Sequence, residues 1–325
     1  MSAVGHAGEM RAKRVLVIKL SALGDFVQAM GPFAAIRAHH PGARITLLTT
    51  KPFVELAERS PYFDEVWFDT RPKPWEVAAM LRLRKLLRTV KFDMVYDLQT
   101  SDRSSAYYRI MGSPPWSGIA TGCSHPHGNP ERDLMHSIDR QAEQLAMAGI
   151  PVTPPPDLSW LAADVERFDL PERFVLMVPG GAPHRLAKRW PATGFIQLAD
   201  QLGGRGIASL LLGTSQDAEQ IEPILAGCST TLSLAGQTGF ADIVGIARRA
   251  LGAVGNDTGP MHLVAATGCP AVVLFSADSD PALCAPRGAV AVLRRDDLAS
   301  LEVDAVLAAL AAGPAALRCA PSALA

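Results

Sequence analysis

The sequence lacks any long hydrophobic run. Its longest apolar stretches, such as residues 251–254 and 271–275, are far shorter than the roughly 20 residues that a membrane-spanning helix needs. Residues 1–13 are polar and rich in glycine and alanine, without the apolar core of a secretory signal. These two absences predict a soluble, cytoplasmic protein.

Cysteine is scarce, and charge of either sign is not in excess. The five cysteines are scattered, odd in number and never form a Cys-x-x-Cys pair, which argues against a disulfide framework or a zinc site. The formal net charge is −1 at pH 7, so no overall attraction to nucleic acid is expected. We therefore predict neither a metal site nor a nucleic-acid partner.

The chain does contain enough residues for two domains. Its 325 residues, 48% of them hydrophobic, exceed the size at which one core usually stops growing, so two domains of about 150 residues are expected. In the first half, short β-branched runs alternate with segments of helical periodicity. Strands are expected at residues 14–20, 43–49, 65–68 and 92–97, and helices at residues 25–39, 52–59, 75–90 and 136–148. Residues 112–133, rich in proline and glycine, are expected to form a long loop.

A proline-rich segment marks the expected domain junction. Residues 151–156 read Pro-Val-Thr-Pro-Pro-Pro, which is typical of a stiff linker. The alternation then restarts, with strands expected at residues 173–178, 207–212, 251–254 and 271–275 and helices at residues 193–202, 217–225, 240–249 and 259–267. We predict an α/β fold with two Rossmann-like, doubly wound domains, residues 1–156 and 157–325, that face a central cleft.

Two segments that follow expected strands carry candidate site residues. Residues 19–25 (Lys-Leu-Ser-Ala-Leu-Gly-Asp) end on Asp25, where a helix begins. A helix start attracts anions, but from placement alone Asp25 is more simply an ordinary N-cap. Residues 178–191 combine a Gly-Gly turn with basic and histidine side chains, Lys188 among them. This composition suits a diphosphate or an ordinary basic surface loop, and the spacing of a Walker loop is absent.

The sharpest motif is residues 255–263, Gly-Asn-Asp-Thr-Gly-Pro-Met-His-Leu. Asp257 or Thr258 can cap a helix whose first turn holds Gly259 and a proline. Such a helix start after a buried strand predicts a phosphate or sugar site. His262 by itself is typical of a packed core histidine.

Together, in this order and spacing, these segments resemble glycosyltransferase family nine, the ADP-heptose:lipopolysaccharide heptosyltransferases. The resemblance extends from about residue 14 to residue 288 and rests on residues 18–25, 97–99, 136–140, 188–191 and 256–262. It implies a GT-B fold, in which the N-terminal domain receives the acceptor and the C-terminal domain binds the nucleotide sugar.

The resemblance also implies a role for each candidate residue. Asp25 would be the general base on the acceptor hydroxyl, and Lys188 would contact the donor phosphates. Asp257, Thr258 and Gly259, completed by His262, would surround the donor sugar and diphosphate. Glu219, or its neighbour Asp217, would bind the ribose. The implied reaction moves a heptose from ADP-heptose, with inversion and without a further cofactor, to a lipopolysaccharide core or related glycan.

The implied acceptor is a lipid-linked anionic glycan at the inner membrane surface, to which the protein would bind peripherally. A basic patch fits this expectation: Arg71, Lys73, Arg82, Arg84, Lys85 and Arg88. Arg71 and Lys73 are expected nearest the cleft. A solvated helix face is the alternative interpretation, because runs of charge usually are that.

An inverting transfer needs a base and a cation that holds the leaving diphosphate. We expect these from opposite domains, Asp25 from the first and Lys188 from the second, so that closure brings them together. The chain departs from the family at residues 276–281, which read Ser-Ala-Asp-Ser-Asp-Pro where relatives carry Gly-Pro-Thr-Asp-Pro. The two carboxylates of this turn are expected to be solvated and to bind no metal.

Other functions share this scaffold, because a fold does not fix its chemistry. A hexosyltransferase and a nucleotide-sugar epimerase are enzyme alternatives. A non-catalytic sugar-nucleotide-binding protein is the alternative from another class.

Overall fold

The computed structural model describes residues 12–181 and 185–318. They form two compact units. Unit 1 comprises the described chain up to Ser21, Gly31–Asp133 and Asp139–Pro155, and unit 2 comprises Ala22–Met30, Leu134–Ile138 and the described chain from Pro156. The predicted junction after residue 156 lies beside the start of the longest segment of unit 2, and two short segments that precede the junction also belong to unit 2.

Unit 1 is built on a six-stranded parallel sheet in the order β3-β2-β1-β4-β5-β6. The strands are β1 (Arg14–Ile18), β2 (Arg44–Thr49), β3 (Glu65–Phe68), β4 (Met94–Asp97), β5 (Trp116–Gly118) and β6 (His125–Pro126). Ile18, the last residue of β1, pairs with Leu48 on one side and Asp97 on the other. The strand order reverses between β1 and β4, which makes their carboxyl ends the switch point of this sheet.

Helices cover both faces of the unit 1 sheet, which explains why β1 reads as a continuous apolar run. They are α2 (Met30–His39), η1 (Lys51–Phe53), α3 (Val54–Glu58), α4 (Val77–Leu87), α5 (Asp102–Ile110), η2 (Arg132–Leu134) and α6 (Ser137–Met147). Leu16 and Ile18 share one buried cluster with Leu87 of α4 and Tyr107 of α5.

The sequence-based expectations for unit 1 were wrong in three places. The predicted helix over residues 25–39 is divided at Ala29 into α1 (Leu23–Gln28) and α2. The predicted loop over residues 112–133 contains β5 and β6, strands that are too short to show a period of two. Helix α5 was not predicted; its N-cap is Ser101, whose hydroxyl accepts a hydrogen bond from the Ser104 amide at 3.2 Å.

Unit 2 repeats the same plan. Its six parallel strands have the order β12-β11-β10-β7-β8-β9: β7 (Phe174–Val178), β8 (Ala208–Leu211), β9 (Thr231–Ser233), β10 (Gly252–Asn256), β11 (Ala271–Phe275) and β12 (Val290–Arg294). The order reverses between β7 and β10, so the switch point lies at their carboxyl ends. Two sheets of this kind confirm the predicted α/β class with two Rossmann-like, doubly wound domains.

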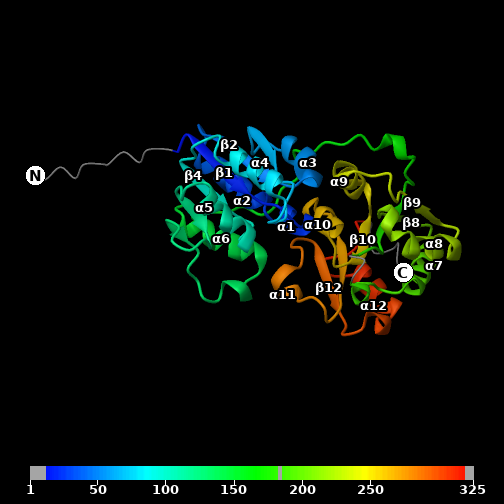
Figure 1. The fold of residues 1–325 in the computed structure, drawn as a ribbon. Helices are drawn as coiled ribbons and strands as arrows, with labels where there is room; N and C mark the ends of the chain where they lie inside the picture. Colours follow the sequence, from blue (N-terminus) through cyan, green and yellow to red (C-terminus); the bar gives the residue numbers. More distant parts are fainter. Residues whose placement is uncertain (1–11, 182–184, 319–325) are drawn as a thin grey trace, which may run out of the picture. The chain divides into compact units, whose positions relative to one another are not determined.

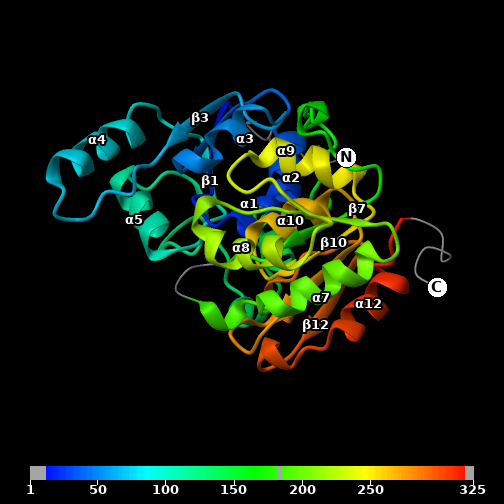
Figure 2. The same ribbon diagram turned by 90° about the vertical axis from the view of Figure 1, so that its right-hand side faces the viewer.

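Helices also flank the unit 2 sheet. They are α7 (Ala192–Gly203), α8 (Ala218–Gly227), α9 (Phe240–Arg249), α10 (Gly259–Ala266), α11 (Pro281–Cys284) and α12 (Val303–Ala311), with η3 (Glu166–Phe168), η4 (Leu186–Lys188), η5 (Ser215–Asp217) and η6 (Leu298–Ser300). Helices α7 and α12 pack on each other, and Phe195 and Leu310 join a buried cluster with β7 and β10. Helix α1 lies beside α10 in both views (Figures 1 and 2). Within residues 12–181 and 185–318, no helix is long and apolar enough to cross a membrane.

Candidate functional site

The candidate site lies at the switch point of unit 2, where β7 and β10 end. Asn256, the last residue of β10, is fully buried. Its side-chain amide donates to the carbonyls of Pro179 and Gly180 at 2.8 and 3.2 Å, and its Oδ1 accepts from the Trp190 amide at 3.0 Å. One side chain therefore fixes both ends of the loop that follows β7. Residues 182–184 of this predicted basic loop, His184 included, lie outside the described residues.

Lys188, Asp257 and Ser279 form one polar cluster. The Lys188 ammonium donates to Asp257 Oδ2 at 2.8 Å and to Ser279 Oγ at 2.7 Å. The Ser279 hydroxyl donates to the same Asp257 oxygen at 2.5 Å. The side chains of Lys188 and Asp257 are only 14% and 10% exposed, and partial burial strengthens such a pair. The structure thus unites two predicted donor-site residues and adds a third group.

Sequence reasoning missed Ser279. The sequence-based prediction for its turn concerned only the two carboxylates, whereas the hydroxyl between them is what reaches Lys188. Asp278 and Asp280 are exposed, and Asp280 Oδ1 accepts from the Ala282 amide at the start of α11. Among the described residues, no group of three or more His, Cys, Asp or Glu side chains is placed to hold a metal ion.

Helix α10 begins directly at this cluster. Thr258 is its N-cap, with extended backbone, and Gly259 and Pro260 form its first turn, as the sequence predicts. The Thr258 hydroxyl donates to the Asn256 carbonyl at 3.2 Å, so it does not cap the helix amides. Pro260 has no N–H, and the Met261 amide donates to the Thr258 carbonyl at 3.1 Å. The positive end of the helix dipole is therefore what favours an anion at the start of α10.

Two glycines seat α1 on α10. A methyl group at Gly259 would lie 2.6 Å from Cβ of Leu23, and one at Gly24 would lie 2.8 Å from the imidazole of His262. Contacts that short do not occur between real side chains, so both positions need glycine for close packing. Gly259 was predicted to line the donor site. Its close packing against α1 is a second reason why this position holds glycine.

This packing corrects the expectation that Asp25 and Lys188 come from different domains. Helix α1, with Asp25 in it, belongs to unit 2, because it packs on α10. Asp25 is the third residue of α1 and not its N-cap, which is Ala22. Its Oδ2 accepts from the Ala22 amide at 3.1 Å. No other hydrogen bond of this partly exposed carboxylate is found among the described residues, so Oδ1 can accept a proton from a hydroxyl.

His262 is buried beside these charges. Burial lowers the pKa of its imidazole, Asp257 and Asp25 oppose that shift, and His136 adds to it. The imidazole is therefore neutral at pH 7. His136 Nδ1 accepts from the Ile138 amide at 3.2 Å, and its Nε2 lies 2.9 Å from the Ala285 carbonyl. Asp25, Asp257 and His262 thus form one electrostatic group inside unit 2.

The acidic pair predicted for the ribose divides into two environments. Asp217 Oδ2 accepts from the amide and hydroxyl of Thr214 at 2.8 and 2.9 Å, and its Oδ1 accepts from the Gly181 amide at 3.3 Å. Asp217 therefore holds local structure. Glu219 is exposed in the first turn of α8, at the same edge of the sheet as the cluster, and its ribose contact stays a prediction.

The predicted acceptor residues lie in unit 1. Arg71 and Lys73 are exposed in the segment between β3 and α4. The Arg71 guanidinium lies 3.5 Å from the Ser21 hydroxyl, and the Lys73 ammonium lies 5.3 Å from the ring centre of Trp75. The other basic residues of the patch, Arg82, Arg84, Lys85 and Arg88, are exposed on or just after α4. All six basic side chains are thus exposed, which fits both an acceptor surface and a solvated helix face.

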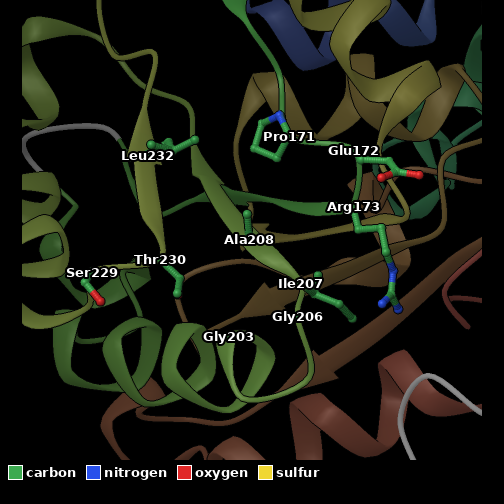
Figure 3. A pocket seen from close by; sticks show the side chains of 10 residues that line it. All are labelled: Pro171, Glu172, Arg173, Gly203, Gly206, Ile207, Ala208, Ser229, Thr230 and Leu232. Atoms are coloured by element: carbon green, nitrogen blue, oxygen red, sulfur yellow. The ribbon is translucent and has the colours of Figure 1, made fainter.

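A pocket of about 460 Å³ opens at the opposite edge of the unit 2 sheet. Its lining includes Arg173, Ile207 and Thr230, each directly before a strand, and Figure 3 shows Ser229 and Arg173 at its two ends. Ligands of open α/β sheets bind at the carboxyl ends of the strands. This pocket is consequently a weaker candidate than the cluster around Asp257.

Comparisons with known proteins identify the family of the chain. A family model described as glycosyltransferase family 9 (heptosyltransferase) matches residues 80–298. Lipopolysaccharide heptosyltransferase 2 of Escherichia coli K12 is 28% identical over 298 residues, which cover 82% of this chain and 83% of that protein. The crystal structure of a family 9 glycosyl transferase from Veillonella parvula matches with a TM-score of 0.81 at 20% identity, covering 92% of this chain and 96% of that one. An E. coli heptosyltransferase solved with ADP matches with a TM-score of 0.72 at 19% identity, covering 90% and 97%.

Proposed function

Since the chain belongs to glycosyltransferase family 9 and is a glycosyltransferase of GT-B fold, we propose that it transfers a heptose from ADP-heptose to a lipopolysaccharide core or a related cell-envelope glycan. The observation that carries this proposal is the group formed by Asp25, His262, Asp257 and Lys188 at the start of α10. Names of relatives add support: the E. coli relative is a lipopolysaccharide heptosyltransferase, and a structural neighbour was solved with ADP.

Asp25 is the general base of the proposed reaction. Its carboxylate takes the proton of the acceptor hydroxyl while that oxygen forms a bond to the anomeric carbon of the heptose. The bond from this carbon to the diphosphate breaks on the opposite face, its electron pair leaves with ADP, and the sugar configuration inverts. Because Oδ2 of Asp25 is already held by the Ala22 amide, the carboxylate is oriented before substrate binds.

The start of α10 and the Lys188 cluster hold the leaving diphosphate. The positive end of the helix dipole and a fixed ammonium both stabilise charge that develops as the bond to the sugar breaks. In the proposed complex Lys188 exchanges part of its contact with Asp257 for a phosphate oxygen. Thr258, Gly259 and the neutral His262 line the sugar, and Glu219 contacts the ribose. The resident residues supply these functions without a further cofactor.

The acceptor surface we propose is the basic patch of unit 1 with the apolar side chains around it. Trp75, Val77 and Leu81 are 73%, 63% and 60% exposed, next to Lys73, Arg82 and Arg84. Between β3 and α4 lies a largely apolar pocket of about 460 Å³. Basic and aromatic groups together suit an anionic lipid surface. A lipid-linked, anionic acceptor at the inner membrane surface, with the protein bound peripherally, fits this composition.

Donor identity is tested by incubating the protein with ADP-heptose, UDP-glucose or UDP-N-acetylglucosamine and a heptose-deficient core acceptor, with products weighed by mass spectrometry. We expect a mass increase of one heptose with ADP-heptose only. Transfer of a hexose at a comparable rate would replace the heptose assignment with a hexosyltransferase. Conversion of a UDP sugar to its epimer without an acceptor would replace transfer altogether.

The acceptor surface is tested by sedimentation with vesicles that contain or lack phosphatidylglycerol. Trp75→Ser and Arg84→Glu should each weaken binding to the anionic vesicles. Val152→Ser is the matched control, because Val152 is 76% exposed in unit 1 but lies far along the chain from the patch. Equal losses in the patch variants and the control would contradict the proposed surface.

A further inference from the structure

Arg189 is a buried cation without a counterion. It is 8% exposed, and its Nη2 donates to the Gly181 carbonyl at 2.8 Å. Its Nε is buried and has no hydrogen-bond partner. Among the residues that the structure describes, no carboxylate lies within ion-pair distance of it. A buried charge is costly when it stays unpaired, so an anion from outside the chain would relieve a cost that the ligand-free protein carries.

The surroundings of Arg189 fit a phosphate group. A methyl group placed on Gly181 would lie 3.6 Å from the orphaned Nε and 3.8 Å from Cγ2 of Thr258. Arg189 therefore converges with the N-cap residue of α10, an eight-residue helix whose dipole is positive at this end. Asn256 fixes the backbone on both sides, through Gly180 and Trp190. A guanidinium beside a helix start offers fork-shaped and dipolar recognition of the same anion.

The balance of charge separates Arg189 from its neighbour Lys188. The ammonium of Lys188 is already neutralised by Asp257 at 2.8 Å, and Asp25 adds a second negative charge to the group around His262. A nucleoside diphosphate brings further negative charge to this place. Lys188 can bind a phosphate only while it also pairs with Asp257. Arg189 pairs with no carboxylate of the described residues, so its full charge can interact with a phosphate.

We propose that Arg189 is a ligand of the donor diphosphate and the main cation that binds it, with Lys188, whose charge is shared with Asp257, as the weaker phosphate contact. This inference rests on the proposed function, because it places the donor at the start of α10. It assigns a residue that the sequence motif Lys-Arg-Trp-Pro did not single out. Its burial became evident only from the fold.

The test uses calorimetric titration of the full chain with ADP, pyrophosphate and adenosine. Arg189→Met keeps the length of the side chain and removes the charge. Loss of a charge-assisted contact predicts a Kd for ADP and for pyrophosphate raised by about 10- to 100-fold, with adenosine unaffected. Arg189→Lys keeps the charge but loses the forked guanidinium, so its Kd for ADP and pyrophosphate should lie between those of the wild type and Arg189→Met. It serves as the second variant if Arg189→Met does not fold.

Stability without ligand gives an independent readout. If Arg189 awaits an anion, Arg189→Met should leave the melting temperature of the ligand-free protein unchanged or raise it. If Arg189 only braces the loop, that temperature should fall. Arg248→Met is the matched control, since its guanidinium also donates to backbone carbonyls of unit 2, those of Leu161 and Leu158. The control should lose stability and keep its Kd for ADP.

The outcomes separate this inference from the proposed donor. Unchanged binding of ADP and pyrophosphate by Arg189→Met would overturn the role of Arg189 and leave the heptosyltransferase proposal standing. If the wild-type protein binds UDP and not ADP, the proposed donor fails. Comparing the Kd for UDP of the wild type and Arg189→Met then tests whether Arg189 binds the diphosphate.

Discussion

The two switch points of this chain share a strand order but differ in what fills them. In unit 1, Gln99 Oε1 accepts from the amides of Leu20 and Ser21 at 2.7 and 3.1 Å, and the buried Lys19 donates to the Leu98 carbonyl. Both side chains thus bind the backbone of unit 1 itself. In unit 2, Asn256 joins two backbone segments in the same way, and the buried Nε of Arg189 is left without a hydrogen-bond partner.

The difference teaches that topology supplies a place for a ligand but not the ligand. In both sheets the strand order reverses between two adjacent strands. Since ligands of open α/β sheets bind at such a point, the rule predicts a site in each unit. The side chains at the strand ends decide the difference. In unit 1 they bind the backbone of the unit itself, whereas in unit 2 the Nε of Arg189 has no partner. Unit 1 carries its basic patch elsewhere, on and around α4. The following predictions test this division, the largest expected effect first.

Asp25→Asn should separate chemistry from binding in unit 2. Loss of the base is expected to lower kcat by about 10²- to 10⁴-fold, because an amide cannot take the proton of the acceptor hydroxyl. The Kd for ADP should stay within about twofold, since Asp25 acts on the acceptor. The measurement pairs steady-state kinetics with calorimetry.

Asp242→Asn is the matched control for Asp25. Asp242 occupies the same third position of a helix in unit 2, where its Oδ2 accepts from the Gly239 amide at 2.9 Å. We expect that variant to lose some stability and keep its kcat. If Asp25→Asn also keeps its kcat, the base lies elsewhere.

Asp97→Asn should change how the stability of the protein depends on pH, because Asp97 is a buried carboxyl at the unit 1 switch point. Asp97 is fully buried, its Oδ2 has no partner, and burial raises the pKa of its carboxyl from 3.8 to about 6. Between those values the folded state binds more protons than the unfolded state, so Asp97 lowers stability as pH rises and does so fully above pH 6. The stability of the asparagine variant should therefore rise relative to that of the wild type, by about 2 kcal/mol, as pH rises from 4 to 6.

Urea unfolding of both proteins at several pH values measures this gain. The Asn carbonyl can still accept from the amides of Gln99 and Thr100, which now bind Asp97 Oδ1 at 3.1 and 3.0 Å. Local structure is therefore kept. Parallel stability curves for the two proteins would contradict a buried, charged Asp97.

Gly24→Ala should unseat α1 from α10. The added methyl group would lie 2.8 Å from the His262 ring, and overpacking of this kind costs about 1–3 kcal/mol, although alanine is the better helix former. The free energy of unfolding in urea measures the loss. Gly42→Ala, a site with nothing within 4 Å, should leave stability unchanged or slightly raised. Equal stability of the two variants would mean that α1 does not depend on this contact.

Much of the fold was predictable from the sequence because its central strands are unbroken apolar runs. The structure gives β3, α9 and β11 the predicted bounds. Strands β5 and β6 escaped because three and two residues carry no periodicity, and α5 because Ser101 and Ser104 resemble loop residues until one caps the other. Short elements draw their stability from neighbours that a linear sequence does not show.

The candidate site was predictable where chemistry follows a strand in sequence. Lys188 and Asp257 follow β7 and β10, and the switch point brings them to 2.8 Å. Ser279 and the packing of α1 were not predictable, because each depends on a contact between distant segments. Asp25 therefore looked like a residue of the first domain, although its helix belongs to the second unit.

Gln99→Ala and Asn256→Ala form the closest pair for comparing the two switch points. Gln99 accepts two backbone hydrogen bonds, and its loss leaves the nearly buried Leu20 amide without a partner, which costs about 1–2 kcal/mol of stability. Asn256 makes three such bonds, all in a fully buried position. Both variants should unfold at lower urea concentration than the wild type. Only Asn256→Ala should also weaken ADP binding, because it frees the backbone that presents Gly181 and Arg189. Equal ADP affinity in both variants would show that the polar side chains at the unit 2 switch point, like those of unit 1, stabilise the fold and do not bind the donor.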